Sequence, residues 1–302
     1  MKVLIAGATG LVGSALKELL INNNIQVAYL TRSKRVSTRD ANAYYWNPRT
    51  KTIDDSCFIN VNAIVNLAGT RVSRPWTKKG KQILVDSRIE STRLLKNSIQ
   101  KYKTHQIKQY VAASAIGIYS SDSNSCQSEE NFKKAKSFLS TLVQNWEKES
   151  LKLEQNNIKT TLVRLGHVFS NKGGFYPILN TFLFGKIGLI LGRGNQIYSW
   201  IHIDDTVQII YNILKNQWVG IYNLVAPEHI SQRELTKILA KHKKHKTKLI
   251  SIPSRLIMLL LGERSQLILN GQSVSAQKLL DKGYVFKFPT TYSCVENLKV
   301  TK

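Results

Sequence analysis

The chain has 302 residues, of which 42% are hydrophobic, and its 44 Lys and Arg residues against 19 Asp and Glu residues give a formal net charge of +25. This length and composition suit a protein with a large buried core and argue against intrinsic disorder. No apolar run approaches the roughly 20 residues that span a bilayer. The longest run, at 256–262, is typical of a buried helix.

The cysteine content and the charge of the chain indicate where the protein is located and which partners it binds. Cys57, Cys126 and Cys294 lie too far apart for a disulfide framework or a metal site, which favours a reducing, cytoplasmic location. The positive charge attracts polyanions, but the basic residues are scattered and form no recognisable nucleic-acid-binding module. His242 and His245 have ligand-like spacing, but the lysines around them repel a cation. We therefore expect no bound metal and no specific nucleic-acid partner.

Strands and helices alternate over the first half of the chain. The apolar start at 2–6 is followed by three glycines and then by Lys17 and Glu18, which fits a strand, a turn and a helix better than a signal peptide. Further strands are predicted at 25–30, 63–69, 109–115 and 159–166, with helices over about 80–100 and 134–150. This alternation predicts the α/β fold class, with a doubly wound parallel sheet covered by helices on both faces.

The pattern loosens after residue 167. We predict a glycine-containing loop region, a helix after "WIHIDD", a strand at 220–225 and a helix from about 231. A lysine-rich linker at 242–248 precedes short helices in "SRLIMLLLG" and "SQLILNGQ". We therefore predict a dinucleotide-binding domain over 1–245, with substrate-side insertions after 167, and a small C-terminal helical unit over 246–302.

The first turn carries a dinucleotide-binding motif. Gly7, Gly10 and Gly13 have the spacing G-x-x-G-x-x-G, between the first predicted strand and the first predicted helix. Glycines there permit a tight turn and a close approach of the backbone to a pyrophosphate, while the helix N-terminus offers amide donors. The predicted cofactor-binding segment comprises Gly7, Thr9, Gly10, Leu11, Val12 and Gly13.

The end of the second strand selects between the two nicotinamide cofactors. An NAD site usually places an acid there to bind the adenosine ribose hydroxyls, whereas an NADP site offers Arg to the 2′-phosphate. This chain has Thr31, Arg32, Lys34 and Arg35, and no acid before Asp40. A guanidinium can bind a phosphate through two hydrogen bonds, so we predict that NADP(H) is preferred over NAD(H).

Several motifs along the chain point to a known family. They are "GATGLVG", "NLAG", Trp76 with "DSRIEST" downstream, "FLSTLVQNWE", "VRLGHV", "WIHIDD", and a tail with "LLLGE", "NGQ" and "KLLDKGYVFKFP". In this order they resemble the extended, atypical short-chain dehydrogenase/reductase superfamily, and within it the NAD-dependent epimerase-like family with a C-terminal domain of unknown function. The resemblance covers nearly the whole chain and implies a Rossmann-like fold.

The resemblance also implies further cofactor contacts. Leu67 and Ala68 would line the adenine side, Arg88 would contact the cofactor, and Val168 would lie near its nicotinamide half. The residues themselves support part of this, because the segment from Asn66 to Gly69 ends a predicted strand, where ligands of open α/β sheets bind. Arg88 alone reads as a solvated basic residue of a helix.

The usual catalytic pair of this superfamily is missing from its expected helix. Short-chain dehydrogenases commonly use a Tyr with a Lys four residues later, and a Ser at the fourth strand that orients the substrate. Ser114 fits the Ser position, but Phe138 and Leu142 stand where the pair would be, in an apolar stripe that predicts a buried helix face. One Tyr-x-x-x-Lys match, at residues 211–215, lies outside the required strand and helix.

Three other places offer alternatives that the sequence leaves open. Tyr119 is a candidate acid or a core tyrosine, and His202, beside two aspartates in "WIHIDD", is a candidate proton shuttle or a hydrogen-bonded wall residue. The "GRGNQ" loop at 192–196 is either a substrate-covering loop or a connector.

The sequence as a whole predicts an NADP(H)-binding, epimerase-like oxidoreductase that acts on an unidentified small molecule. The alternative is a non-catalytic protein that senses the dinucleotide. We expect a monomer or homodimer with no membrane partner.

Overall fold

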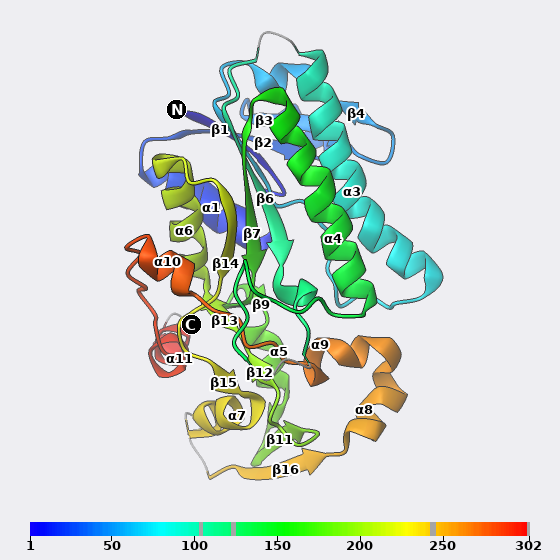
Figure 1. Ribbon diagram of the computed structural model, residues 1–302, viewed down its shortest axis with the longest axis vertical. Coiled ribbons are helices and arrows are strands. Elements are labelled where there is room, and N and C mark those ends of the chain that lie inside the picture. The colour runs from blue at the N-terminus through cyan, green and yellow to red at the C-terminus, as the bar shows by residue number, and fades with distance from the viewer. Residues whose placement is uncertain (103–104, 122–124, 242–245, 301–302) are drawn as a thin grey trace. The chain divides into compact units, whose positions relative to one another are not determined.

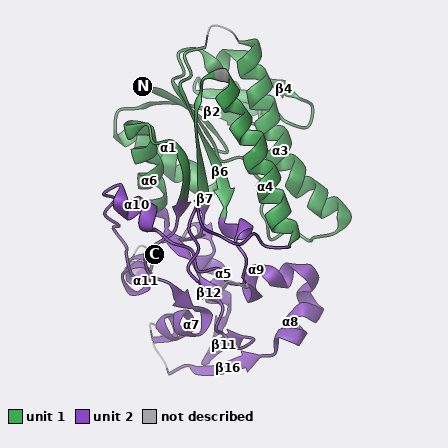
Figure 2. Cartoon of the chain, viewed as in Figure 1, with its two compact units in different colours: residues 1–115, 137–164, 206–222 green, residues 116–136, 165–205, 223–302 purple. Residues whose placement is uncertain are grey.

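The computed structural model describes residues 1–102, 105–121, 125–241 and 246–300 (Figure 1). It divides into two compact units (Figure 2). Unit 1 comprises residues 1–115, 137–164 and 206–222, and unit 2 comprises residues 116–136, 165–205 and 223–302. Each unit is therefore assembled from three separate segments of the chain.

Unit 1 is built on an eight-stranded sheet with the strand order β14-β7-β6-β5-β1-β2-β3-β4. The strands β1, β2, β3 and β5 pair in parallel, as do β5 and β6, while β4 is antiparallel to β3. In the register, Ala6 pairs with both Leu30 and Asn66, so the carboxyl ends of β1, β2 and β5 meet at one edge of the sheet. The strand bounds are β1 Lys2–Ala6, β2 Gln26–Thr31, β3 Ala43–Asn47, β4 Thr52–Ile53, β5 Ala63–Asn66, β6 Gln109–Ala115, β7 Lys159–Leu165 and β14 Gly220–Leu224.

Helices cover both faces of this sheet. In Figure 1, α3 (Lys78–Lys101) and α4 (Phe138–Leu151) lie side by side on one face, with α1 (Leu11–Asn22) and α6 (Ile203–Asn216) on the other. The predicted doubly wound α/β sheet is thereby confirmed. The helix expected over 134–150 begins only at Phe138, because the Ser137 hydroxyl accepts a hydrogen bond from the Ser140 amide and caps it there.

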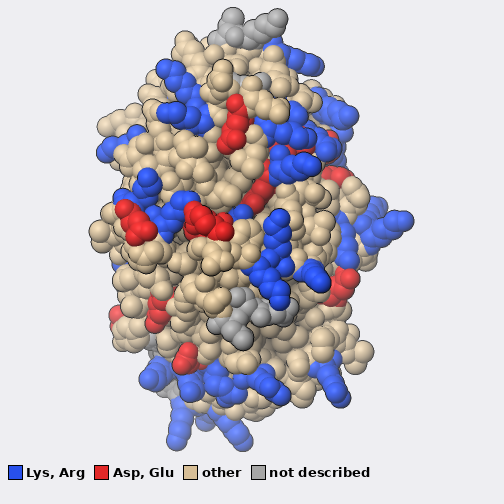
Figure 3. Space-filling model, viewed as in Figure 1, with Lys and Arg blue, Asp and Glu red and all other residues tan. Residues whose placement is uncertain are grey.

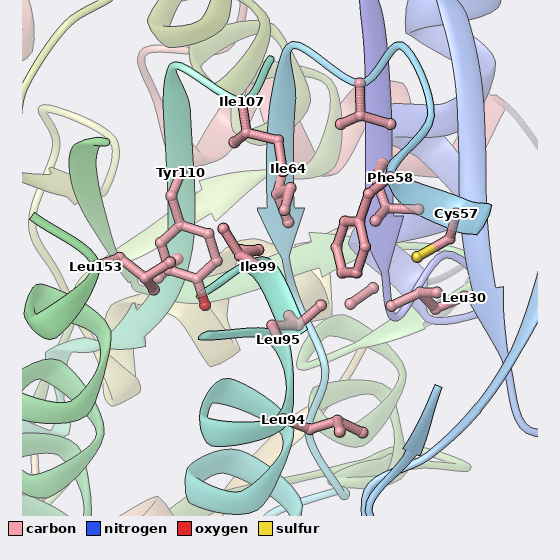
Figure 4. Close-up of a cluster of buried hydrophobic side chains, with 14 of the residues drawn as sticks. Leu30, Cys57, Phe58, Ile64, Leu94, Leu95, Ile99, Ile107, Tyr110 and Leu153 are labelled. Atoms are coloured by element: carbon pink, nitrogen blue, oxygen red, sulfur yellow. The ribbon is translucent and has the colours of Figure 1, made fainter. Parts of the chain in front are cut away.

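The core between the sheet and α3 is mostly apolar, and the polar side chains Asn66 and Tyr110 within it are hydrogen-bonded to each other. Leu95 and Ile99 of α3 pack on Ile64 and Tyr110 of the central strands (Figure 4). The Asn66 side-chain amide donates to the Tyr110 hydroxyl at 2.8 Å, and burial raises the pKa of Tyr110 to about 12. A buried hydroxyl with such a partner avoids the desolvation cost of an unpaired one.

The apolar stripe of α4 is buried over most of its length. Leu142, Val143 and Trp146 are each 4–5% exposed. Phe138, in the first turn, is only half-buried; its ring meets Trp76 edge to face at 5.4 Å, with the Lys81 ammonium 5.2 Å from the ring centre. The stripe therefore joins the core only from its second turn onward.

Unit 2 contains short strands where the sequence suggested loops. Three small sheets form, with the orders β10-β11-β16, β12-β15 and β13-β8-β9. Most of these strands have two to five residues, too few for a clear alternation of apolar and polar side chains. Their bounds are β8 His167–Ser170, β9 Gly173–Gly174, β10 Leu183–Phe184, β11 Ile187–Leu191, β12 Ile197–Tyr198, β13 Trp200–His202, β15 Ile230–Ser231 and β16 Lys248–Ile252.

The helices of unit 2 are short, and one of them overturns an expectation. The predicted buried helix at 256–262 is α8, Ser254–Leu261, in which Ile257 is buried but Leu259 is 82% exposed. An apolar run alone predicts burial, but α8 has only one side packed on its own unit. The remaining helices include α5 Tyr176–Thr181, α7 Gln232–Lys241, α9 Gln266–Leu269, α10 Gln277–Asp281 and α11 Thr291–Val300. Among the described residues, no helix is long and apolar enough to cross a membrane.

A buried carboxylate holds the C-terminal tail within unit 2. Asp205, 1% exposed, accepts hydrogen bonds from the Tyr284 hydroxyl at 2.7 Å, the Lys287 amide at 2.8 Å and the Phe288 amide at 3.0 Å. The neighbouring Asp204 pairs with the Lys287 ammonium at 2.8 Å. The two aspartates of "WIHIDD" thus fix the "KGYVFKFP" segment to the start of α6.

An aromatic cluster surrounds His167 at the start of β8. Its ring stacks on Phe175 at 4.3 Å and meets Tyr198 edge to face at 5.2 Å. Burial lowers the pKa of His167 to about 4, so the imidazole is neutral at physiological pH.

The first prediction concerns His167 and pH. The folded-state pKa lies below the ordinary value of 6.5, so the unfolded chain takes up this proton first as the pH falls. The free energy of unfolding should therefore decrease from about pH 6.5 to about pH 4, by at most about 3 kcal/mol. Urea unfolding of the parent and His167→Phe across this range measures the effect, because the Phe ring stacks but does not titrate. Parallel pH curves would contradict it.

The second prediction compares two positions of α4. Leu142→Ala empties a buried site and should lower the free energy of unfolding by about 2 to 5 kcal/mol. Phe138→Ala, at a half-buried site, should cost less, about 1 to 3 kcal/mol. Chemical denaturation of both variants tests the difference, and an equal or larger cost at Phe138 would place its ring in the core.

Candidate functional site

The turn after β1 packs its backbone directly on the loop after β5. Gly7 has a φ of +85°, and a Cβ there would lie 2.8 Å from the Leu67 carbonyl carbon. A Cβ at Gly13 would overlap the Gly7 carbonyl oxygen, which itself accepts the Gly10 amide at 3.0 Å. Side chains at Gly7 and Gly13 are therefore excluded, as the sequence pattern predicts for a phosphate-binding turn.

The rim of this turn faces solvent. Thr9 and Gly10 are exposed, Leu11 and Val12 open α1, and the first turn of α1 holds no acidic side chain. The first amides of a helix lack partners within the helix and carry partial positive charge, so this rim suits a phosphate.

The end of β2 presents a basic side chain with no competing acid. Thr31 is buried, with its hydroxyl accepting the Ser33 amide at 3.1 Å, while Arg32 is exposed. The next acid, Asp40, accepts a 2.6 Å hydrogen bond from the Tyr29 hydroxyl and a 2.9 Å bond from the Asn42 amide. The Tyr29 hydrogen bond lowers the pKa of Asp40. The Asp40 carboxylate is thus engaged by hydrogen bonds from nearby residues of the same part of the chain.

The loop after β5 is held by α3. Ala68 is buried and Gly69 exposed, and the Ser87 hydroxyl accepts the Thr70 amide at 3.1 Å. The Arg88 guanidinium donates to the Thr70 carbonyl at 3.1 Å, and a Cβ at Gly69 would lie 3.3 Å from its central carbon. These contacts explain the "DSR" motif: Ser and Arg on one helical turn fix the loop.

Arg88 is a cation without a carboxylate partner in the described part of the chain. It lies over the Trp146 ring at 5.2 Å and donates to the Leu84 and Thr70 carbonyls. Burial lowers the pKa of Arg88 to about 10, which leaves the group charged at neutral pH. The sequence alone suggested a solvated residue, whereas the Arg88 side chain is only partly exposed and donates to backbone carbonyls.

Ser114, at the end of β6, belongs to a buried polar network. Its hydroxyl donates to the Glu147 carboxylate at 2.5 Å, and Arg164 donates to both Glu147 oxygens at 2.8 and 3.0 Å. All three side chains are at most 8% exposed. The Ser114 proton is committed to Glu147, so towards a ligand this hydroxyl can only accept a hydrogen bond.

Three predicted residues lie in unit 2. Tyr119 is fully buried, and its hydroxyl donates to the Asn223 side-chain carbonyl at 2.6 Å. His202 is 2% exposed, its Nδ1 accepts the Asp204 amide at 3.1 Å, and burial lowers its pKa. Val168 pairs with Ile201 between β8 and β13. These contacts are structural, and a catalytic or cofactor role for any of the three stays a prediction.

The other residues singled out from the sequence lie in a loop, on α6 and outside the described residues. The loop at 192–196 is pinned, since Gln196 donates to the Ile268 carbonyl and Arg233 to the Arg193 carbonyl. Tyr211 and Lys215 share α6. His242 and His245 lie outside the described residues, and within the described ranges no cluster of His, Cys, Asp or Glu could hold a metal ion.

Two residues of the Ser114 network, Glu147 and Arg164, were not predicted from the sequence, although both leave a signal in it. Glu147 continues the apolar stripe of α4 four residues after Val143, so an acid stands on a buried helix face. Arg164 is the only charged residue within "TTLVRL" of β7. Charges at core positions of two adjacent elements indicate a buried ion pair.

The residues of unit 1 fit a dinucleotide. The glycine turn carries no side chains that would block a pyrophosphate, the N-terminus of α1 offers amides, and Arg88 is a partly buried cation with no carboxylate partner among the described residues. Gly7, Gly13, Leu67 and Ala68 come together in the backbone contact, with Thr31 and Arg32 at the same sheet edge.

Known proteins show the same architecture. A model of the NAD dependent epimerase/dehydratase family matches residues 3–224, and one of a domain of unknown function, DUF1731, matches residues 252–298. The chain is 32% identical over 299 residues to an epimerase family protein, SSP1921, of Staphylococcus saprophyticus, and 33% identical over 300 residues to SAOUHSC_00792 of Staphylococcus aureus, with 98% of each chain covered. The solved structure of the human epimerase family protein SDR39U1 (isoform 2) with NADPH has a TM-score of 0.84 at 27% identity, covering 100% of both chains. The fold is Rossmann-like, and the chain belongs to the NAD-dependent epimerase/dehydratase family.

Proposed function

We propose that this protein binds NADP(H) and acts as an oxidoreductase or epimerase-like enzyme on a small molecule. The observation that carries the proposal is the exposed Arg32 at the end of β2, one residue beyond Thr31 and with Asp40 engaged by Tyr29. An NAD site needs a free acid at this place, whereas a 2′-phosphate needs a cation. The NADPH in the structure of the human relative supports the same cofactor.

Arg88 and the amides of α1 supply the remaining charge for this cofactor. A dinucleotide phosphate bears negative charge that must be matched once it leaves water. The amides at the N-terminus of α1 and the Arg88 guanidinium beside Gly69 would meet this need.

The Ser114 hydroxyl is the polar group that we expect to contact the substrate. A bound nicotinamide ring would accept or deliver hydride at a carbon of the substrate. Ser114 would accept a hydrogen bond from a substrate hydroxyl, since its own proton is directed to Glu147. Phe138 and Leu142 hold no ionisable group, so proton transfer would use a residue outside the usual pair.

A second function, dinucleotide sensing without turnover, is favoured by the same apolar positions. A protein that retained the cofactor turn and lost its acid would have Phe138 and Leu142 as found here. Turnover separates the two functions. NADPH oxidation above background with a panel of carbonyl compounds, at an NADPH requirement that Arg32→Ala raises, supports the enzyme; tight NADPH binding without turnover supports the sensor.

The third prediction tests the choice of cofactor. Arg32→Ala should weaken NADPH binding by about ten- to a hundredfold, because a charge-assisted contact is worth roughly 1.5 to 3 kcal/mol. NADH affinity should stay unchanged. Calorimetry in moderate salt on the parent, Arg32→Ala and Arg39→Ala measures this, since Arg39 is an equally basic, exposed side chain beyond the short helix α2 (Lys34–Ser37). An equal loss of NADPH affinity in both variants would show that net positive charge, and not a contact of Arg32, accounts for the effect.

The fourth prediction tests Ser114. Ser114→Ala should leave NADPH affinity intact and lower whatever turnover the parent shows, because the substrate loses an acceptor. The loss of its hydrogen bond to Glu147 should cost about 1 to 3 kcal/mol of stability. Ser91→Ala is the matched control, since Ser91 is buried in α3 and bonds only to backbone carbonyls. Turnover unchanged by Ser114→Ala would remove this residue from the substrate site.

A further inference from the structure

One face of the β10-β11-β16 sheet in unit 2 is apolar although it is open to solvent. Phe184 pairs with Ile187, and Ile187 with Lys248, so these side chains share a face with Ile250, two residues along β16. The opposite face packs inward, with Leu183 6% and Ile190 1% exposed. On the outer face, by contrast, Phe184 is 52% and Ile250 40% exposed.

Helix α8 begins two residues after β16 and also exposes apolar side chains. Leu256 and Met258 are 46% and 47% exposed, and Leu259 and Leu260 are 82% and 71% exposed. We call the outward side chains Phe184, Ile250, Leu256, Met258, Leu259 and Leu260 the β16–α8 surface. Single exposed apolar residues are ordinary, but six on adjoining elements mark an interaction surface.

Basic side chains surround the β16–α8 surface. Lys186 and Lys248 are exposed and adjacent, with the Lys248 amide donating to the Lys186 carbonyl at 2.8 Å, and Arg255 is exposed at the start of α8. Figure 3 shows Lys and Arg outnumbering acids at the end of unit 2 where Figure 1 labels α7, β16 and α8. A partner of this surface must therefore be apolar in its centre and negative at its rim.

We propose that the β16–α8 surface docks on an anionic lipid bilayer. Aliphatic side chains on a short helix, with lysine and arginine beside them, are the composition that inserts at the boundary between headgroups and acyl chains. The most protruding side chains, Leu259 and Leu260, would enter the acyl region, while Lys186, Lys248 and Arg255 would meet lipid phosphates.

Two other occupants fit the surface less well. A second copy of this chain would bring the same basic rim, and a formal charge of +25, against itself. A protein partner usually recognises surfaces rich in Trp and Tyr, and the β16–α8 surface contains neither. The expectation of no membrane partner rested on the missing spanning segment, which a surface lying on the bilayer does not need.

The test is co-flotation of the full chain with vesicles of phosphatidylcholine mixed with phosphatidylglycerol, compared with vesicles of phosphatidylcholine alone, at physiological salt. We expect binding to the mixed vesicles only. Leu259→Ser should weaken it about tenfold, as expected for removing one large apolar side chain from the acyl region. The control is Val285→Ser, also in unit 2, because Val285 is 86% exposed but lies outside the β16–α8 surface.

A second comparison, between basic residues beside the surface and basic residues elsewhere, tests the role of charge. Replacing Lys248 and Arg255 by Ala should weaken binding by about fivefold for each charge, whereas replacing the exposed Lys172 and Lys282 should change it less. Equal losses in the surface and control variants would show that only the net charge binds lipid.

Absence of vesicle binding would overturn the proposal, and a dimer dissolved by Leu259→Ser would assign the surface to a second copy. Thermal unfolding of each variant separates these results from misfolding, and none of them depends on cofactor binding or turnover.

Discussion

The backbone contact between Gly7 and Leu67 is the constraint on which the predicted dinucleotide site depends. It forces the turn after β1 into a conformation with φ of +85° that only glycine adopts without strain, and leaves no space for a side chain. This contact fixes where α1 begins, and so where its free amides lie. From the other side, Arg88 and Ser87 fix the continuation of the loop at Thr70.

Buried hydrogen bonds hold the two helices α3 and α4 in place behind that site. Asn66 binds Tyr110 of β6 and Thr92 of α3, and Glu147 of α4 binds Ser114 and Arg164. A buried ion pair adds little net stability but strongly penalises any arrangement that separates its partners. The end of β6 is thus fixed by buried hydrogen bonds to α4 and β7, while Phe138 and Leu142 of α4 are apolar.

The sequence predicted six of the eight strands of the unit 1 sheet, because their signals are local, and missed β3 and β4 at one edge of the sheet. Continuous apolar strands such as 2–6 and 109–115 and the glycine spacing at residues 7–13 each need only neighbouring residues to be recognised. Contacts between distant segments were not predictable in the same way: Glu147 with Arg164, or Asp205 with Tyr284, depend on which elements the fold brings together. The apolar run at 256–262 shows a different limit, since hydrophobicity does not tell whether the chain itself or something else covers a helix. The short strands of unit 2 fell below the length at which alternation is visible.

The attachment of the tail to Asp205 has a consequence for synthesis on the ribosome. Tyr284, Lys287 and Phe288 lie 79, 82 and 83 residues after Asp205. Until they leave the exit tunnel, the carboxylate at the start of α6 has none of these donors, and burying it would be costly. Strands β1 to β7 of unit 1 precede Asp205 in the chain and need none of these donors, whereas unit 2 is completed only once residues 284–288 are available. Until that segment is available, the aromatic residues around β8 that share a core cluster with Phe288, Phe169 and Trp200 among them, lack this packing partner.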